Sequence, residues 1–383
     1  MSRILKCHDI VKTDFVHAEN CFLYDQQGRQ YIDLESGIWC TAVGHSHPRI
    51  SQVIADQASR LMHLGTRYPN TIVEETALSV LEIVQMGDGK CTFLSSGSEA
   101  VEFGVQSICR VTGKKLLLTF TNSYLAAYGS SGKKQKEEWF MLDWTRYPST
   151  EDFLADIPFE QIGGFVLEPG GSGSGFVQFP PLELVQEIVQ AIKNNGGLVM
   201  ANEITTGMGR TGKWFGFQHY EIKPDIVALG KGLGNGYPVS AVAMRREVAD
   251  ILECGGLRYA QSHQNDPLGC AVACEVIRIM KEENLVVRGA ELGAYFLQGL
   301  QTLAKKHPIV KDARGRGMLL GLELQPHENL SVEVLYHALL EKGFLVGFYP
   351  AGNFLRMDPA LTIERESIDQ FLNVLNLILN QLK

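Results

Sequence analysis

The feature that most constrains the fold is an alternation of two textures between about residues 90 and 245. Short apolar runs recur there, at 91–94, 116–120, 165–168, 198–201, 226–230 and 239–244. Amphipathic segments separate these runs; the clearest, 181–194, stops at Asn195-Gly196-Gly197. Apolar strands that alternate with helices are typical of a mostly parallel sheet covered by helices. The chain is therefore predicted to belong to the α/β class.

The sequence on either side of this region predicts a second, smaller α+β unit. Residues 21–25 and 30–34 read as a hairpin around Gly28. After about residue 270 the pattern becomes helical again, with a strand predicted at 318–324 and a long helix at about 366–381. We expect residues 49–268 to form the large domain, and the segments 1–48 and 269–383 to form the small one.

Polar residues follow several of the predicted strands, where ligands bind in open α/β sheets. Ser96 to Ala100 open a helix whose free N–H groups suit a phosphate, although an N-cap Ser with a Glu in the first turn explains the same residues. Lys231 follows the run 226–230. A lysine at the end of a buried strand can have its pKa lowered, as an imine-forming amine requires. From this feature alone, a lysine that caps a strand at the surface is the more common explanation.

Charge and composition indicate what kind of partner to expect. The net charge of −8 and pI of about 5.7, with no run of Lys and Arg, argue against nucleic acid and favour a small molecule. The chain has no apolar signal core and no run near the roughly 20 apolar residues of a membrane span. Its eight cysteines are scattered without a CxxC pair, which predicts a reducing, cytoplasmic setting.

Taken together, these stretches resemble a known family. They are Tyr31-Ile-Asp-Leu, Gly44-His45-Ser-His47-Pro48, Ser96-Gly97-Ser98-Glu99-Ala100, Leu167-Glu168-Pro169, Asn202-Glu203, Gly207-Met-Gly-Arg-Thr-Gly-Lys213, Lys231-Gly232, Asp266-Pro267-Leu268 and Arg314-Gly-Arg-Gly317. Over nearly its full length the chain resembles the class III (ornithine, acetylornithine and ω-amino acid type) aminotransferases, which have fold type I and depend on pyridoxal 5′-phosphate.

The resemblance implies a cofactor site and a dimer. By this resemblance, Lys231 corresponds to the Schiff-base lysine and general base of such enzymes. Tyr124 matches the aromatic residue that stacks on the cofactor ring, and core packing is its alternative. Ser262, five residues before Pro267, takes the place of a Thr that reaches the phosphate of the neighbouring subunit, which implies a homodimer with shared active sites. The cofactor-binding residues implied are Gly97, Ser98, Tyr124, Glu168, Asn202, Thr205, Lys231 and Ser262.

The resemblance also places the substrate. Arg356 matches an arginine that grips the substrate carboxylate, a task suited to a planar bidentate donor, while a surface salt bridge is its alternative. Trp39 either lines the substrate pocket or packs in the core. His45 and His47 lack a third ligand at a metal-site spacing and are taken as a turn motif, so no metal is expected.

Four residues depart from the family pattern. Asn202 stands where the family has an Asp that keeps the cofactor's ring nitrogen protonated. Gly173 replaces a glutamate that gates the carboxylate-binding arginine, so Arg356 is expected to be ungated. Ala127 replaces an arginine of acetylornithine-type enzymes, and Thr205 replaces a common Gln.

These features predict an aminotransferase that moves an amino group from an amino acid or ω-amine to a 2-oxo acid. One alternative is a racemase, epimerase or lyase on the same scaffold, which needs no 2-oxo acid acceptor. The other is a catalytically silent relative that binds cofactor or a protein partner; Asn202 favours it, whereas Lys231 and Arg356 argue against it.

Overall fold

The apolar runs form a seven-stranded sheet in the computed structural model, which describes residues 3–8, 11–146, 154–171, 177–328 and 330–381. Strands β5 to β9 run parallel, whereas β10 is antiparallel to both of its neighbours. The mostly parallel sheet is therefore confirmed. In spatial order the strands are β4 (Lys90–Leu94), β10 (Ser240–Met244), β9 (Ile226–Leu229), β8 (Leu198–Asn202), β7 (Ile162–Leu167), β5 (Leu116–Phe120) and β6 (Trp139–Leu142).

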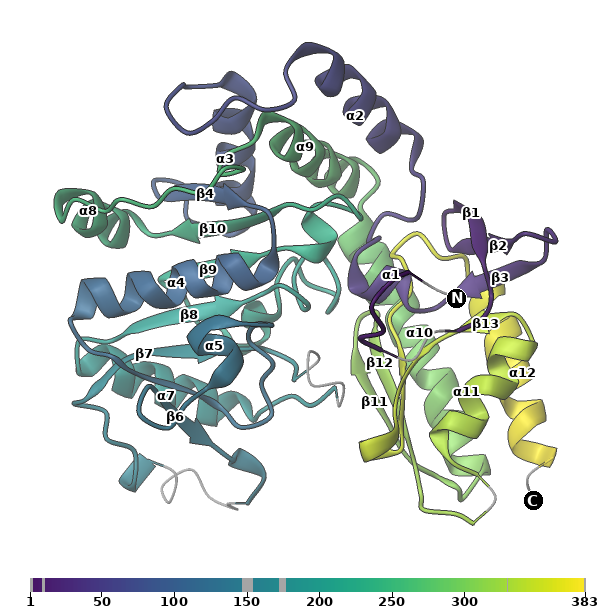
Figure 1. The fold of residues 1–383 in the computed structure, drawn as a ribbon. Coiled ribbons are helices and arrows are strands. Elements are labelled where there is room, and N and C mark those ends of the chain that lie inside the picture. Colours follow the sequence, from purple (N-terminus) through teal and green to yellow (C-terminus); the bar gives the residue numbers. More distant parts are fainter. Residues whose placement is uncertain (1–2, 9–10, 147–153, 172–176, 329, 382–383) are drawn as a thin grey trace.

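Both faces of this sheet are covered, which explains why its strands are apolar throughout. In β7, the side chains of Phe165 and Leu167 belong to one hydrophobic cluster, and Val166 between them belongs to another. Successive side chains of a strand point to opposite faces, so each cluster fills one side of the sheet. Helices α4 and α7 pack on the sheet (Figure 1).

Helices and short 3-10 turns lie between and beside the strands of this larger body. They are α2 (Pro48–Arg60), α3 (Thr71–Ile83), α4 (Gly97–Thr112), α5 (Gly129–Lys133), α7 (Leu182–Asn194), α8 (Arg246–Cys254) and α9 (Pro267–Glu282), with the 3-10 turns η1 (Trp144–Arg146), η2 (Gly216–Tyr220) and η3 (Lys231–Leu233). In the part of the chain that the structure describes, no helix has both the length and the apolar character to cross a membrane.

The two ends of the chain build a second, smaller body (Figure 1). The predicted hairpin forms, and its second strand, β3, pairs in parallel with β13 from the C-terminal part. This confirms a smaller α+β unit assembled from both termini. Its strands are β1 (Phe15–Glu19), β2 (Phe22–Asp25), β3 (Gln30–Asp33) and β13 (Phe344–Leu345) in one sheet, and β11 (Val310–Arg316), β12 (Leu319–Leu324), β15 (Phe354–Met357) and β14 (Gly347–Tyr349) in another. Its helical elements are α1 (Ser36–Trp39), α10 (Leu285–Lys306), α11 (Val332–Glu341), α12 (Arg365–Gln381) and η4 (Pro350–Gly352).

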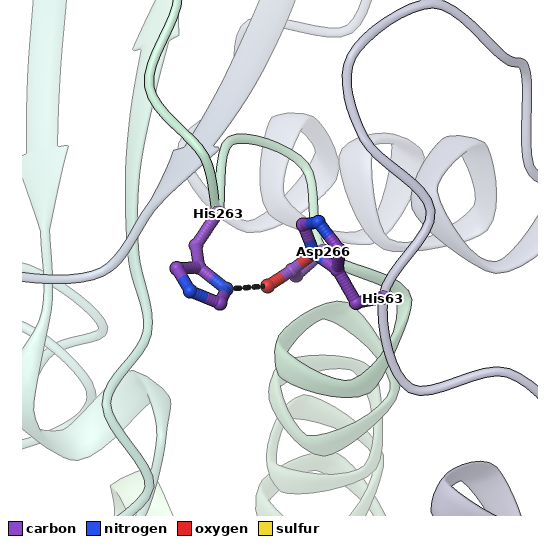
Figure 2. Close-up of side chains that lie close together, drawn as sticks. All are labelled: His63, His263 and Asp266. Carbon is purple, nitrogen blue, oxygen red and sulfur yellow. Dashed lines mark hydrogen bonds and ion pairs between the residues drawn. The ribbon is translucent and has the colours of Figure 1, made fainter.

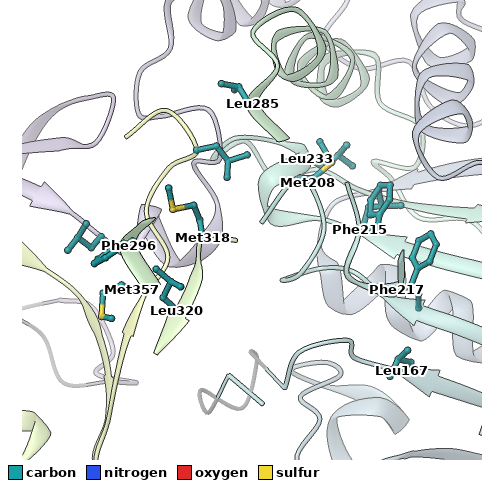
Figure 3. Packing of buried hydrophobic residues seen from close by; sticks show 14 of the residues in the cluster. Leu167, Met208, Phe215, Phe217, Leu233, Leu285, Phe296, Met318, Leu320 and Met357 are labelled. Carbon is teal, nitrogen blue, oxygen red and sulfur yellow. The ribbon is translucent and has the colours of Figure 1, made fainter. Parts of the chain in front are cut away.

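One hydrophobic cluster runs through both bodies (Figure 3). It joins Leu167 and Phe215 of the large body to Met318 and Met357 of the small one. A backbone hydrogen bond from Met318 N–H to the carbonyl of Arg210 crosses the same boundary at 2.9 Å. The residues at this junction are therefore held by packing from both sides.

Candidate active site

Lys231 lies at the junction of strand and turn that the sequence predicted. It follows β9 and begins η3 with a backbone φ of +43°, a conformation that residues other than glycine rarely adopt. Its Nζ lies 3.1 Å from Thr205 Oγ1 and 4.9 Å from the centre of the Trp39 ring. Burial lowers the pKa of the Lys231 amine below that of an exposed lysine. The amine is thus closer to its neutral, nucleophilic form.

Asn202 ends β8, next to β9, and is almost fully buried. Its amide Nδ2 makes long contacts to the carbonyl oxygens of Tyr124 and Leu125, at 3.5 and 3.4 Å, and its Oδ1 accepts from Ile204 N–H at 3.3 Å. The amide therefore meets two acceptors on one side and one donor on the other. A carboxylate would match only the donor.

Glu168 ties the segment after β5 to the end of β7. Its Oε2 accepts a 2.8 Å hydrogen bond from Tyr124 N–H, while the Tyr124 side chain remains about half exposed. Because Tyr124 O also faces Asn202, the structure brings Glu168, Tyr124 and Asn202 together.

The N-terminus of α4 has the donors expected of an anion site. Ser96 and Glu99 form a capping box, so the structural alternative for this motif is present as well. Gly97 and Ser98 precede the first intrahelical bond, from Ala100 N–H to Ser96 O at 3.1 Å, so their N–H groups point beyond the helix. A Cβ on Gly97 would lie only 2.7 Å from Ile204 Cγ2, hence only glycine lets the α4 turn approach the segment after β8 so closely.

Arg356 is buried and not part of a surface salt bridge. Its guanidinium is sandwiched between the Trp39 ring, 3.6 Å from Cζ to the ring centre, and the backbone of Gly347, where a Cβ would meet Nη2 at 2.6 Å. Nε donates to Asp358 at 2.5 Å, Nη1 to the Tyr349 hydroxyl, and Nη2 to Glu35 at 2.7 Å.

The ion pair with Glu35 corrects one expectation. Arg356 was expected to be ungated because Gly173 replaces the gating glutamate. Gly173 lies outside the described residues. The carboxylate of Glu35, from a different segment of the chain, instead accepts a hydrogen bond from Arg356 Nη2. Burial raises the pKa of Glu35 to about 7 and that of Asp358 to about 6, although Arg356 opposes both shifts. Sequence reasoning missed Glu35 because 321 residues separate it from Arg356.

Trp39 and Glu35 are presented by an unusual turn. Ser36, Gly37, Ile38 and Trp39 all have positive φ, at 45°, 57°, 61° and 65°. Such left-handed backbone costs roughly 1–2 kcal/mol for each residue other than glycine. Asp33 holds the turn by accepting from Glu35 N–H at 2.8 Å and Gly37 N–H at 3.2 Å. Strain of this size that tertiary contacts maintain is characteristic of functional sites.

Ser262 is exposed in the segment that precedes α9. Among the described residues, no hydrogen bond joins it to Lys231 or Thr205 of the same chain. Next to it, His63, His263 and Asp266 point toward one another (Figure 2). His263 Nδ1 lies 2.5 Å from Asp266 Oδ2, and His63 Nδ1 bonds to the other oxygen. Two imidazole–carboxylate hydrogen bonds account for this cluster.

The fold and these groups define the class of the protein: a fold-type I enzyme with a lysine amine at the carboxyl edge of its parallel strands. A model of the family "Aminotransferase class-III" matches residues 6–131 and 150–379. The chain therefore belongs to the class III aminotransferases, transferases whose cofactor is pyridoxal 5′-phosphate. This confirms the resemblance, the enzyme class and the cofactor predicted from the sequence.

Individual relatives cover almost the whole chain. Acetylornithine aminotransferase of Methanothermobacter thermautotrophicus is 30% identical over 374 residues, which span 96% of this chain and 93% of the relative. Leucine/methionine racemase of Thermococcus litoralis is 29% identical over 399 residues, covering 94% and 89%. Among solved structures, acetylornithine aminotransferase from Elizabethkingia anophelis has a TM-score of 0.87 at 25% identity, covering 99% of this chain and 96% of that one.

Proposed function

We propose that Lys231 is the residue through which this aminotransferase binds its cofactor and moves the substrate proton. The observation that carries the proposal is the desolvated Nζ, held 3.1 Å from Thr205 at the carboxyl edge of β9. An amine with a lowered pKa attacks a carbonyl near neutral pH, and after substrate has taken its place it serves as a general base.

The donors around Lys231 fit pyridoxal 5′-phosphate. The N-terminal turn of α4, with the N–H groups of Gly97 and Ser98 and the Ser98 hydroxyl, suits its phosphate. Asn202 suits its ring nitrogen as a neutral partner. Tyr124, whose backbone carbonyl contacts the Asn202 amide at 3.5 Å, is the aromatic residue proposed to stack on the ring. When bound, the cofactor supplies an electron-accepting ring that makes the substrate's C–H bond acidic. Lys231 Nζ would then take the proton from the substrate carbon.

We infer that Arg356 binds the substrate carboxylate and that Trp39 lines the substrate pocket. Trp39 contacts both Lys231 and Arg356, so one indole links the reacting amine to the guanidinium. The substrates proposed are an amino acid or ω-amine as donor and a 2-oxo acid as acceptor. N-acetylornithine belongs among the donors to test, because relatives carry that name, although Ala127 removes one feature of such enzymes.

We further propose a cytoplasmic homodimer with shared active sites. The eight cysteines are free thiols, which supports a reducing compartment. The exposed Ser262 would complete the phosphate site of a second subunit. If so, Lys231→Ala and Ser262→Ala subunits, each weak alone, should regain activity on mixing, because one site of each hybrid carries both native residues. Failure of the mixture to recover activity would contradict the shared site.

The experiment that tests the function is a spectral titration of the holoenzyme with amino acids, N-acetylornithine and diamines, without any acceptor. Conversion of the cofactor to pyridoxamine phosphate with release of a carbonyl product is the expected result. A cofactor spectrum that no amine changes would instead identify a catalytically silent relative.

A racemase is a second candidate because the Thermococcus relative is a leucine/methionine racemase. It predicts that the optical rotation of a single amino acid decays without a 2-oxo acid, while the cofactor stays in its aldehyde form. Leucine and methionine are the amino acids to try first.

A further inference from the structure

A cluster of two histidines and one aspartate joins two segments that are far apart in the sequence. His63 lies between α2 and α3, whereas His263 lies just before α9 and Asp266 is the N-cap of that helix. One possible ligand atom from each side chain lies within 4.8 Å of the other two (Figure 2). Sequence spacing drew attention to His45 and His47 instead, because 203 residues separate His63 from Asp266. The fold therefore brings together three groups that can each coordinate a metal ion.

The ligand atoms of the cluster converge on one point. The Nδ1 atoms of His63 and His263 bond to the two oxygens of the same carboxylate, Asp266 Oδ1 and Oδ2, the second at 2.5 Å. The ring planes are inclined by 54°, with their centres 5.0 Å apart. In a tetrahedral zinc site the ligand atoms lie about 3.3 Å from one another. His263 Nδ1 would thus move away from Asp266 by about 0.8 Å to admit the ion, and its 63% exposed side chain has room to do so.

Hydrogen bonds explain the arrangement in the metal-free chain, but they hold it weakly. The side chains of His63 and His263 are 45% and 63% exposed. Exposed ion pairs add little stability, because water screens them and ordering their side chains costs entropy. A metal ion in place of the two Nδ1 hydrogens would fix the same side chains more firmly. Each neutral imidazole keeps its hydrogen by moving it to Nε2, where solvent can accept it.

The donor set selects the class of ion. Two imidazole nitrogens and one carboxylate oxygen match the three protein ligands of zinc sites that keep a fourth position open. Calcium and magnesium prefer oxygen ligands, and the set has no thiolate that would favour Cu(I). His263 and Asp266 also line a cavity of about 270 Å³, which Ser95 and Tyr237 line as well. That volume leaves room for a water molecule as the fourth ligand.

We propose that His63, His263 and Asp266 bind one divalent transition-metal ion, with zinc as the best match. The ion clamps the segment between α2 and α3 to the start of α9. Because Ser262 adjoins His263 in the sequence, the clamp would also fix the residue proposed to complete the phosphate site of a second subunit. This last consequence rests on the proposed dimer, whereas the metal site itself does not.

The test is calorimetric titration of the holoenzyme with zinc chloride, after a chelator and dialysis have removed bound metal. We expect one zinc ion per chain. Loss of a residue that merely supports a ligand costs about 10- to 100-fold in affinity, so His63→Ala and His263→Ala should each weaken zinc binding by at least about 100-fold. Asp266→Asn, which keeps a good N-cap residue but removes the charge, should also bind zinc more weakly. Magnesium chloride should give no comparable binding.

His337→Ala is the matched control, because His337 is an exposed histidine on a different helix, α11. It should bind zinc as the native enzyme does. Absence of a site with one zinc ion per chain, or equal affinity in the native enzyme and His263→Ala, would overturn the proposal.

X-ray absorption at the zinc edge separates this site from the exposed thiols of Cys7 and Cys254. We expect nitrogen and oxygen neighbours at about 2.0–2.2 Å and no sulfur at about 2.3 Å. A sulfur neighbour would place the ion on a thiolate and refute the assignment. Zinc should also raise the midpoint of thermal unfolding of the native enzyme and of His337→Ala, but not of His263→Ala, because a ligand of the folded state stabilises it. An unchanged midpoint in the native enzyme would contradict the clamp.

Discussion

Replacing Asn202 by aspartate should trade stability for rate, because the surroundings of the side chain favour an amide. In Asn202→Asp, the Nδ2 contacts to the carbonyls of Tyr124 and Leu125, at 3.5 and 3.4 Å, become contacts between oxygens. Only Ile204 N–H, at 3.3 Å, remains as a donor. A buried polar group that loses its partner costs about 1–3 kcal/mol. The cofactor-free variant should lose free energy of unfolding in that range.

The effect on the reaction has the opposite sign. A carboxylate at position 202 would hold a proton on the ring nitrogen of the bound cofactor, which stabilises the negative charge that develops as Lys231 removes the substrate proton. A charge-assisted hydrogen bond of this kind is worth roughly 2–4 kcal/mol in a buried site, or about 30- to 1,000-fold in rate. Single-turnover measurements of the half-reaction with a saturating amino donor would detect this change, and denaturant unfolding would measure the stability.

Asn235→Asp is the matched control. Asn235 is also buried, and its amide also bridges a donor and an acceptor, Val43 N–H at 3.0 Å and Gly44 O at 2.9 Å. This variant should lose stability without gaining rate. If Asn202→Asp is no faster than the native enzyme, the reasoning is refuted and the site is adapted to a neutral ring.

Three further substitutions test other parts of the site. Lys231→Ala should abolish the visible absorption of bound cofactor on titration with pyridoxal phosphate, and a persisting native band would remove the lysine from its role. Arg356→Lys keeps the buried charge but loses the planar fork, so KM for carboxylate substrates should rise about 10- to 100-fold while KM for amines without a carboxylate changes little; equal effects on both would contradict the carboxylate role. Burial raises the pKa of Glu203 to about 7, so between about pH 4.5 and 7 this carboxyl group ionises in the unfolded chain but stays protonated in the folded one. The free energy of unfolding should therefore fall by roughly 2–4 kcal/mol as pH rises across that window. Glu203→Gln can still bond Thr206 and Gly216 and should lack this part of the fall in denaturant titrations; a pH profile identical to the native one would show that Glu203 does not titrate there.

Much of the large sheet could be predicted because its strands carry their own signal. The runs 116–120 and 226–230 are apolar on both faces, and the strands observed at β5 and β9 lie within one residue of them. The short strand β6 was missed, since its four residues follow a charged stretch that shows no periodicity. Once the strands were predicted, the residues that follow them could be predicted to lie near one another. Parallel strands end at one edge of the sheet, which brings Asn202, Thr205 and Lys231 together.

The carboxylate end of the site shows where this reasoning stops. Asp358 lies only two residues after Arg356, just beyond the end of β15, so their contact is local in the sequence. No local pattern links either residue to Glu35, which reaches Arg356 from the other end of the chain through a left-handed turn. The expectation of an ungated Arg356 was therefore wrong: the sequence showed the loss of one carboxylate, and only the fold could show that another takes its place.

The amino-acid sequence by itself determined the α/β class, the family and the chemical types available to the site, because hydrophobic periodicity and short motifs are local properties. The tertiary structure alone decided which charges face one another. Whether Arg356 is free or paired, and whether Glu35 carries a proton near neutral pH, depends on burial and on distances between segments over 300 residues apart. Electrostatic energies in a buried site vary steeply with such distances.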